Sequence, residues 1–330
     1  MIELCLTTKE KASKNIYPKN GRLKLIKIMK NFHKKAFSLV ELSMVILIIG
    51  ILIAGVSQGI DLYQDMRLAT ARSLTKNSRV ARISDLVSWY ETTNENVFSE
   101  GTTSFKNIEK IQADQKINRW KDSNPNSIYK YDATQTTEAN QPKIIFDKDT
   151  SLPIVRFDGN PRFLALPDGT VPFGDSEYTV IFISKYDPTC FERCGVLGSG
   201  NYGADKQTNV FRYNLPSKNV YNYWWYVDIV SPENTISPNK FQIFIFDYNK
   251  STRNIYINGT NVKSSLNSGR ESTKSNNTMG LTCSTSGCSG GPEYLVGSIA
   301  ELIIYDRALL NDERKSIEKY LSKKWSIKIN

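Results

Sequence analysis

An apolar stretch near the start of the chain decides its fold: Phe37-Ser38-Leu39-Val40-Glu41-Leu42-Ser43-Met44-Val45-Ile46-Leu47-Ile48-Ile49-Gly50-Ile51-Leu52-Ile53-Ala54-Gly55-Val56. From Phe37 to Ile60, Glu41 is the only formally charged residue. A helix rises about 1.5 Å per residue, so about 20 such residues cross a hydrocarbon core of about 30 Å. The stretch therefore predicts a membrane-spanning helix.

The residues in front of this stretch are basic, and then small. Lys34 and Lys35 precede Ala36, which directly precedes Phe37. A cleaved secretory signal carries its small-residue site after the apolar region, whereas here the small residue comes before it. The alternative is an ordinary signal peptide or signal anchor in which Glu41 is incidental.

The combination of basic leader, small residue, Phe and an early Glu resembles the processing site of type IV prepilins and type II secretion pseudopilins. The resemblance implies that a bacterial prepilin peptidase cuts between Ala36, where the family has Gly, and Phe37, and then methylates the new amine. It also implies that Glu41 pairs with the N-terminal ammonium of a neighbouring subunit, because a carboxylate in a membrane helix is costly without a partner. Other pilins or pseudopilins are thus the expected partners.

Residues 1–36 form the predicted leader, and a start at Met29 would give a compact basic leader of the same kind. The leader holds ten Lys and Arg against two Glu, so it carries +8 of the formal +10 and leaves +2 for the rest. Nucleic-acid binding needs clustered basic charge on the folded part, so we expect no nucleic-acid partner. The basic flank favours a single-pass inner-membrane protein with a cytoplasmic N-terminus and a periplasmic or extracellular head.

The chain has one histidine, His33, and it lies in the leader. Without it, the mature protein cannot use a Ser-His-Asp triad, a Cys-His pair or histidine metal ligands. Most hydrolase mechanisms are thereby excluded.

The remainder divides into three predicted segments. We expect helix over residues 37–92, because Ile83, Leu86, Val87 and Tyr90 follow the spacing of one helical face. Residues 93–118 are polar and contain loop signals, which predicts a connector. From Arg119 to residue 330 the sequence consists of short β-type runs. The predicted fold class is therefore α+β.

The β-type runs predict a two-sheet sandwich. Thr179–Ser184, Phe241–Phe246 and Ile299–Tyr305 are rich in β-branched and aromatic residues. Asn258-Gly259 lies between two such runs and predicts a hairpin, because a type I′ turn needs positive φ at both centres. Many short strands over about 200 residues are typical of a sandwich.

A C-terminal helix is predicted to start at Asn311 as its N-cap. Its expected apolar face contains Ile317, Tyr320, Leu321 and Trp325.

Several ordered segments resemble the laminin-G-like, concanavalin A-like jelly roll of bacterial surface proteins. They are Trp120–Ser123, Gln141-Pro142, Val155–Asn160, Ile255–Val262 and Gly297–Leu309. The resemblance covers residues 119–327 and implies a jelly-roll head.

The head contains two close pairs of cysteines, and Cys5 belongs to the leader. Four cysteines allow three pairings, of which we predict the local ones, Cys190 with Cys194 and Cys283 with Cys288. An exported domain meets an oxidising compartment, which favours disulfides. The alternative is a zinc site with four thiolate ligands.

An aromatic segment, Asn222–Asp228, is the candidate ligand site. Strand alternation places Tyr223, Trp225 and Val227 on one face, and the opposite face holds Asn222, Trp224, Tyr226 and Asp228. If the first set is core, the second is a platform for a sugar ring. The alternative is that both faces are buried.

We expect no cofactor. The carboxylates Asp122, Asp158, Asp168 and Asp187 could serve calcium, but they form no dense Asp/Asn loop.

These features predict a minor pilin or pseudopilin that presents a glycan- or protein-binding head on a type IV pilus-like fibre, for adhesion. One alternative is a component of a type II secretion pseudopilus. Another is a membrane-anchored glycoside hydrolase, which needs two carboxylates about 5–9 Å apart. Glu301 stands alone in its predicted strand and Asp228 has no Glu within four residues, so we predict that the chain is not an enzyme.

Overall fold

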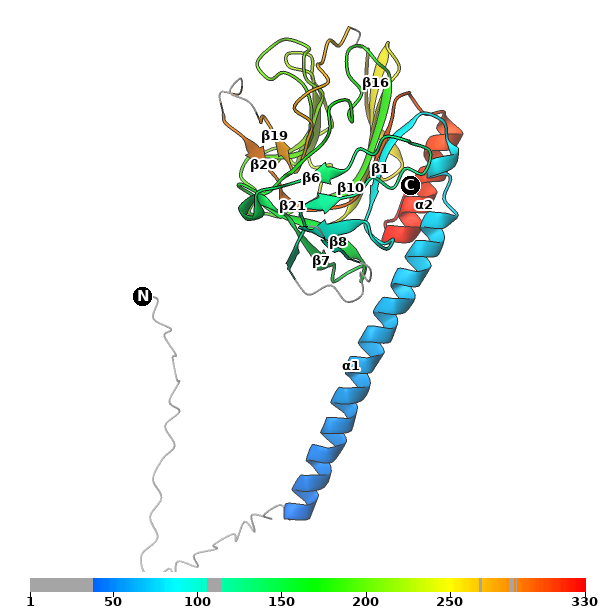
Figure 1. Cartoon of the computed structure of the whole chain (residues 1–330), viewed down its shortest axis with the longest axis vertical. Coiled ribbons are helices and arrows are strands. Elements are labelled where there is room, and N and C mark those ends of the chain that lie inside the picture. Colours follow the sequence, from blue (N-terminus) through cyan, green and yellow to red (C-terminus); the bar gives the residue numbers. More distant parts are fainter. Residues whose placement is uncertain (1–37, 102, 106–113, 267–268, 285–287, 289) are drawn as a thin grey trace, which may run out of the picture. The chain divides into compact units, whose positions relative to one another are not determined.

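The computed structural model describes residues 38–101, 103–105, 114–266, 269–284, 288 and 290–330. Figure 1 shows a long N-terminal helix and a domain built mainly of strands. The chain divides into two units, Met1–Ala54 and Gly55–Asn330, and helix α1 contributes residues to both. The predicted processing residues, Ala36 and Phe37, lie outside the described residues.

Helix α1 (Leu39–Lys76) has 38 residues, and its N-terminal part is apolar all round. Its large apolar side chains are exposed from Leu39 to Met66. Among the described residues it is the helix that is long and apolar enough to cross a membrane. The Glu41 carboxylate accepts a hydrogen bond from the backbone N–H of Ser38 (2.9 Å) in the first turn.

The end of α1 differs from the prediction of a helix up to residue 92. The helix stops at Lys76, and a 3₁₀ turn, η1 (Val80–Arg82), leads into strand β1 (Leu86–Glu91). Trp89 and Tyr90 of β1 pack into two different hydrophobic cores, on opposite faces of a sheet. The helical spacing was therefore misleading, because pairing of this segment with a neighbouring strand overrides it.

Residues 93–118 were expected to form a connector, and this was wrong. They contain the strands β2 (Phe98–Glu100), β3 (Thr103–Ser104) and β4 (Gln115–Lys116). Phe98 is fully buried, with its ring centroid 5.5 Å from that of Trp120. The sandwich thus starts at β1 rather than at Arg119.

Two antiparallel sheets form the sandwich. Within the described residues the first has nine strands, in the order β17 (Thr260–Leu266), β16 (Thr252–Ile257), β15 (Gln242–Tyr248), β10 (Tyr178–Tyr186), β21 (Val296–Tyr305), β8 (Pro153–Asp158), β7 (Lys143–Phe146) and β4, with β1 also paired to β21. The second has ten, in the order β14 (Ile229–Val230), β13 (Asn219–Tyr223), β12 (Val210–Asn214), β11 (Arg193–Gly198), β18 (Thr278–Met279), β9 (Leu164–Ala165), β6 (Ala133–Thr134), β5 (Arg119–Trp120), β2 and β3.

Aromatic side chains fill the space between the sheets. Phe182 and Phe246 of the first sheet pack against Phe211 of the second, with ring centroids 6.4 and 5.0 Å apart, and Phe244 of the first sheet packs against Tyr213 of the second (5.6 Å). Two antiparallel sheets around such a core form a jelly-roll-like sandwich. The predicted hairpin is also confirmed, because β16 and β17 are joined by Asn258 and Gly259, whose φ angles are +50° and +86°.

Helix α2 (Asn311–Trp325) covers the other face of the first sheet. Its predicted apolar face, Ile317, Tyr320, Leu321 and Trp325, is buried in a second core. The N-cap is Leu310, one residue before the predicted one, and its N–H donates to the Glu313 carboxylate (2.9 Å).

A fully buried charge cluster lies beneath α2. Lys324 Nζ is 3.1 Å from both Glu91 and Glu301, which face each other in β1 and β21. The indole N–H groups of Trp89 (2.8 Å) and Trp325 (2.9 Å) also donate to Glu301. Buried charges are stable only when they are paired in this way, so the cluster fixes the position of α2 on the sheet.

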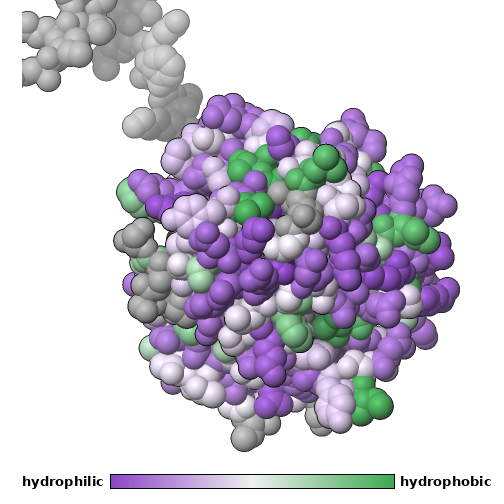
Figure 2. Space-filling view, turned by 90° about the horizontal axis from the view of Figure 1, so that it is seen from above, coloured by the Kyte–Doolittle hydropathy of each residue, from purple (hydrophilic) through white to green (hydrophobic). Residues whose placement is uncertain are grey.

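The face of the head that Figure 2 draws is mostly polar. Figure 2 shows one face on which hydrophobic side chains form small, separate groups among hydrophilic ones. A small two-stranded sheet, β19 (Leu281–Thr282) and β20 (Glu293–Tyr294), completes the described strands.

Candidate functional site

The small sheet lies on the outer face of the second sheet, over β11. Gly195 of β11 makes this approach possible, because a Cβ at this position would overlap Thr282 and stand 2.6 Å from the carbonyl oxygen of Glu293. Side chains alternate along β12 and β13, so Phe211 points into the core whereas Arg212 and Tyr223 point outward. The two sheets therefore enclose polar groups of β11, β12, β13 and β20.

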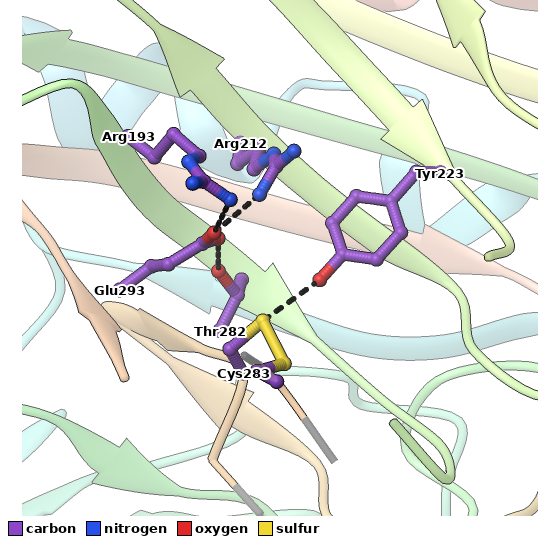
Figure 3. Close-up of a disulfide and its surroundings, with 7 residues drawn as sticks. Arg193, Arg212, Tyr223, Thr282, Cys283 and Glu293 are labelled. Carbon is purple, nitrogen blue, oxygen red and sulfur yellow. Dashed lines mark hydrogen bonds and ion pairs between the residues drawn. A yellow bond between two sulfur atoms is a disulfide. The ribbon is translucent and has the colours of Figure 1, made fainter. Parts of the chain in front are cut away.

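Figure 3 shows the polar cluster at this place, where two arginines converge on one carboxylate. Glu293 accepts hydrogen bonds from Nη1 of Arg193 (3.3 Å), from Nη1 of Arg212 and from the hydroxyl of Thr282 (2.8 Å). The guanidinium of Arg212 also lies 4.5 Å from the ring centroid of Tyr223. Because two cations share one anion, this cluster carries an excess of positive charge.

A disulfide borders the cluster. Cys283 and Cys288 are paired, with a Cα–Cα distance of 5.7 Å, and the Tyr223 hydroxyl lies 3.3 Å from Cys283 Sγ. Cys190 and Cys194 form the second disulfide (Cα–Cα 6.4 Å). Both predicted local pairings are thus present, and these sulfurs are not free to bind zinc.

Next to this disulfide is a pocket of about 290 Å³ that combines aromatic and charged side chains. It is lined by Arg193, Arg212, Tyr223, Trp225, Tyr226, Asp228, Cys283, Cys288, Gly290 and Glu293. Such a mixture of apolar surface and convergent polar groups is typical of ligand sites.

Two of the four predicted ligand-binding residues lie in the core, so that part of the prediction was wrong. Asn222 and Trp224 are almost fully buried on the inner face of the second sheet. The Asn222 side-chain oxygen accepts hydrogen bonds from Tyr178 (2.7 Å) and from Arg253 (2.7 Å), whose guanidinium lies 3.7 Å from the Trp224 ring centroid. Asparagine is buried here because its polar groups are satisfied inside the core.

The other two, Tyr226 and Asp228, line the pocket because of a turn after β13. Trp225 and Tyr226 have φ angles of +68° and +64°, which shift the alternation of side chains along the segment. Tyr226 is 81% exposed. Left-handed backbone is unfavourable for bulky residues, so the surroundings must hold it. Arg253 donates to the carbonyl oxygen of Val227 (2.7 Å) and supplies that support.

Asp228 differs electrostatically from an ordinary aspartate. Burial raises the pKa of its carboxyl, although the backbone N–H of Trp224 (3.3 Å) and the charges of Arg253 and Arg212 act in the opposite direction. Asp228 therefore binds a proton at a higher pH than a fully solvated aspartate does.

Three of the four candidate calcium ligands, Asp122, Asp158 and Asp187, bind other groups of the protein. Asp122 accepts hydrogen bonds from the backbone N–H groups of Trp89 and Asn124 (2.9 Å each), while Asp158 and Asp187 bind Arg156 (2.9 and 3.3 Å). Asp168 is exposed. Among the described residues, no three His, Cys, Asp or Glu side chains gather as metal ligands would.

The sequence analysis did not identify Arg193, Arg212 and Glu293. They come from three strands, and no local pattern connects them. Arg193 lies directly before Cys194 and Glu293 follows Cys288 by five residues, so charged residues beside the cysteine pairs were the available signal.

Two family models match the sequence. Residues 31–57 match the prokaryotic N-terminal methylation motif, and residues 158–313 match the concanavalin A-like lectin/glucanases superfamily, in its laminin-G-like form. The chain is a prepilin-like protein with a laminin-G-like, concanavalin A-like jelly-roll head. No curated protein matches the sequence.

Similar solved structures are remote. A Trypanosoma rangeli sialidase in complex with sialic acid has 14% identity and a TM-score of 0.48, covering 75% of this chain and 34% of the sialidase. Domain 4 of AbnA, an extracellular arabinanase from Geobacillus stearothermophilus, in complex with arabinotriose, has 15% identity and a TM-score of 0.42, covering 73% of this chain and 98% of that domain. The chain thus spans about a third of the sialidase that it matches.

Proposed function

We propose that this chain is a minor pilin or pseudopilin, cleaved and N-methylated at Phe37 by a prepilin peptidase and assembled into a type IV pilus-like fibre. The methylation motif over residues 31–57 is the observation that carries the proposal. The exposed apolar surface of α1 supports anchoring in the inner membrane before assembly. The N-terminus then remains cytoplasmic, and the head lies in the periplasm or outside the cell.

Glu41 is the proposed assembly residue. Its carboxylate bonds only to the Ser38 N–H among the described residues, so it retains capacity to accept a further donor. The ammonium of a neighbouring subunit would supply this donor within the membrane, where an unpartnered carboxylate is costly.

The head is proposed to bind a glycan or a protein, for adhesion. Its pocket offers aromatic rings, on which the C–H face of a sugar packs, beside charged groups that bind hydroxyls. In this proposal the head is not catalytic and needs no cofactor. Asp228 and Glu293 both line the pocket, but Glu293 is engaged by two arginines and Thr282, which disfavours the hydrolase alternative.

Mass spectrometry of the membrane-extracted protein tests the processing step. We expect N-methyl-phenylalanine at Phe37 in wild-type cells and an unprocessed chain in cells that lack the peptidase. Recovery of the unprocessed chain from both strains would overturn the proposal.

The assembly step is tested with Glu41→Ala, with Ser43→Ala as the matched control in the same turn. Glu41→Ala should be inserted and cleaved normally but be missing from sheared fibres, whereas Ser43→Ala should be incorporated. Normal incorporation of both variants would show that Glu41 has no assembly role. Deletion of the gene separates the alternatives: loss of protein secretion with intact surface fibres would favour a type II secretion pseudopilus.

A further inference from the structure

Two arginines and two acids line the pocket, but both arginines form their ion pairs with the same acid. Arg193 and Arg212 share the single carboxylate of Glu293. Asp228, the other acid in the pocket, accepts a hydrogen bond from the Trp224 N–H and forms no ion pair within the described part of the chain. The two guanidiniums thus have one direct anionic partner between them.

Both guanidiniums also have unused donors. A guanidinium carries five N–H groups, and each arginine uses one nitrogen, Nη1, on Glu293. Nε of Arg212 is buried and has no hydrogen-bond partner among the described residues. The Arg193 side chain is 42% exposed and reaches the pocket with its other nitrogens unpaired in the same part of the structure. Planar N–H donors of this kind match a carboxylate, which they bind at two oxygens.

Aromatic side chains also line the pocket. Trp225 and Tyr226 stand on the left-handed turn, with ring centroids 6.5 Å apart and planes inclined by 73°. A backbone conformation this unfavourable for bulky residues, held by Arg253, presents both rings at the pocket. The arginines and the aromatic rings together fit a ligand that has an apolar ring face and an anionic group.

We propose that the pocket recognises the carboxylate of an acidic sugar, with the carboxylate on Arg193 and Arg212 and the ring on Trp225 and Tyr226. This inference rests on the proposed glycan-binding role of the head and names the chemical class of its ligand. Asp228, which also lines the pocket, accepts hydrogen bonds from sugar hydroxyls.

The test measures binding of the detergent-solubilised full chain to an array of carboxylated oligosaccharides. The probes are oligomers of galacturonate, glucuronate and mannuronate, together with sialyllactose, and each is also presented as its methyl ester, which keeps the rings and removes the charge. We expect at least one acid to bind about tenfold more tightly than its ester.

Arg193→Gln should remove this preference while the chain keeps its thermal melting temperature, because the side chain lies partly in solvent. Arg119→Gln is the matched control. Arg119 lies on the same sheet, is 50% exposed and has one carboxylate neighbour, Asp132, at 3.8 Å. Its substitution should change nothing.

Two results would overturn the inference. Equal binding of acids and esters would show that the pocket does not recognise the carboxylate. The proposed glycan binding would remain supported. Absence of binding to every glycan would overturn the inference together with the glycan part of the proposed function, while the processing and assembly assays test the rest separately.

Discussion

On each face of the second sheet an arginine lies against an aromatic ring. The two arginines differ in how many of their hydrogen-bond donors are already used within the protein. On the inner face, Arg253 covers Trp224 and spends its nitrogens on the oxygens of Asn222 and Val227. On the outer face, Arg212 covers Tyr223 and binds Glu293 through one nitrogen. A guanidinium whose three nitrogens all donate to protein oxygens stabilises the fold, whereas one with spare donors is available to a ligand.

The largest difference between the two faces should come from replacing the adjacent tryptophans, Trp224 on the inner face and Trp225 on the outer face. Trp224→Ala empties a fully buried site and should lower the free energy of unfolding by about 3–5 kcal/mol. Trp225→Ala should lower it by less than about 1 kcal/mol and instead weaken glycan binding, because this ring borders the pocket. Denaturant unfolding and glycan binding of both variants measure the difference. Equal destabilisation would show that the two tryptophans do not have different roles.

Replacing Arg253 and Arg212 should give a smaller difference in stability between the inner and outer faces. Arg253→Met leaves buried oxygens of Asn222 and Val227 without donors and should cost about 2–4 kcal/mol of stability. Arg212→Met leaves Glu293 paired with Arg193 and should cost about 1 kcal/mol, with a larger effect on acid binding. Thermal melts of the two variants would contradict this order if Arg212→Met were the less stable.

Gly195→Ala tests whether the outer face depends on the close approach of the small sheet. The added methyl group overlaps Thr282 and Glu293, so β19 and β20 must shift. We expect a loss of about 1–3 kcal/mol, as for other overpacked sites, together with weakened ligand binding. An unchanged affinity in the folded variant would show that the pocket does not need this sheet.

The smallest expected effect is a dependence of binding on pH through Asp228. Its carboxyl has a raised pKa, so it loses its charge at a higher pH than the carboxylate of an acidic sugar does. Ionised Asp228 repels that carboxylate, while Arg193 and Arg212 attract it and Glu293 stays paired. Binding should therefore tighten a few-fold as the pH falls from neutrality toward this pKa, and then weaken once the ligand itself is protonated. Titration of affinity against pH should show this rise in the wild type, and Asp228→Asn should lack it.

Local patterns in the sequence predicted much of the fold. The first part of α1 follows from an apolar run with one charged residue, Glu41, the turn at Asn258 and Gly259 from two residues that accept positive φ, and the buried face of α2 from helical spacing. Each of these depends on residues close together in the chain. The strand β1 was missed because its apolar residues satisfy the helical spacing and only pairing with β21 decides between the two.

The site was less accessible to prediction. Alternation separated Asn222 and Trp224 from Tyr223 and Trp225, but it could not tell which pair faces the core. Beyond this point it was wrong, because positive φ at Trp225 and Tyr226 brings Tyr226 and Asp228 to the same pocket. Neither residue type signals such a turn. Arg193, Arg212 and Glu293 meet only because three strands and a small sheet bring them together.

The two disulfides join cysteines that are only four and five residues apart. Loops this small constrain the unfolded chain weakly, by about 2 kcal/mol each, so they contribute little to holding the two large sheets together. Cys283–Cys288 is part of the pocket wall, and Arg193 lies inside the loop that Cys190–Cys194 closes. We therefore expect a chain with reduced cysteines to keep the core of its head but to lose part of the pocket wall, so that the proposed ligand binding would depend on arrival in an oxidising compartment.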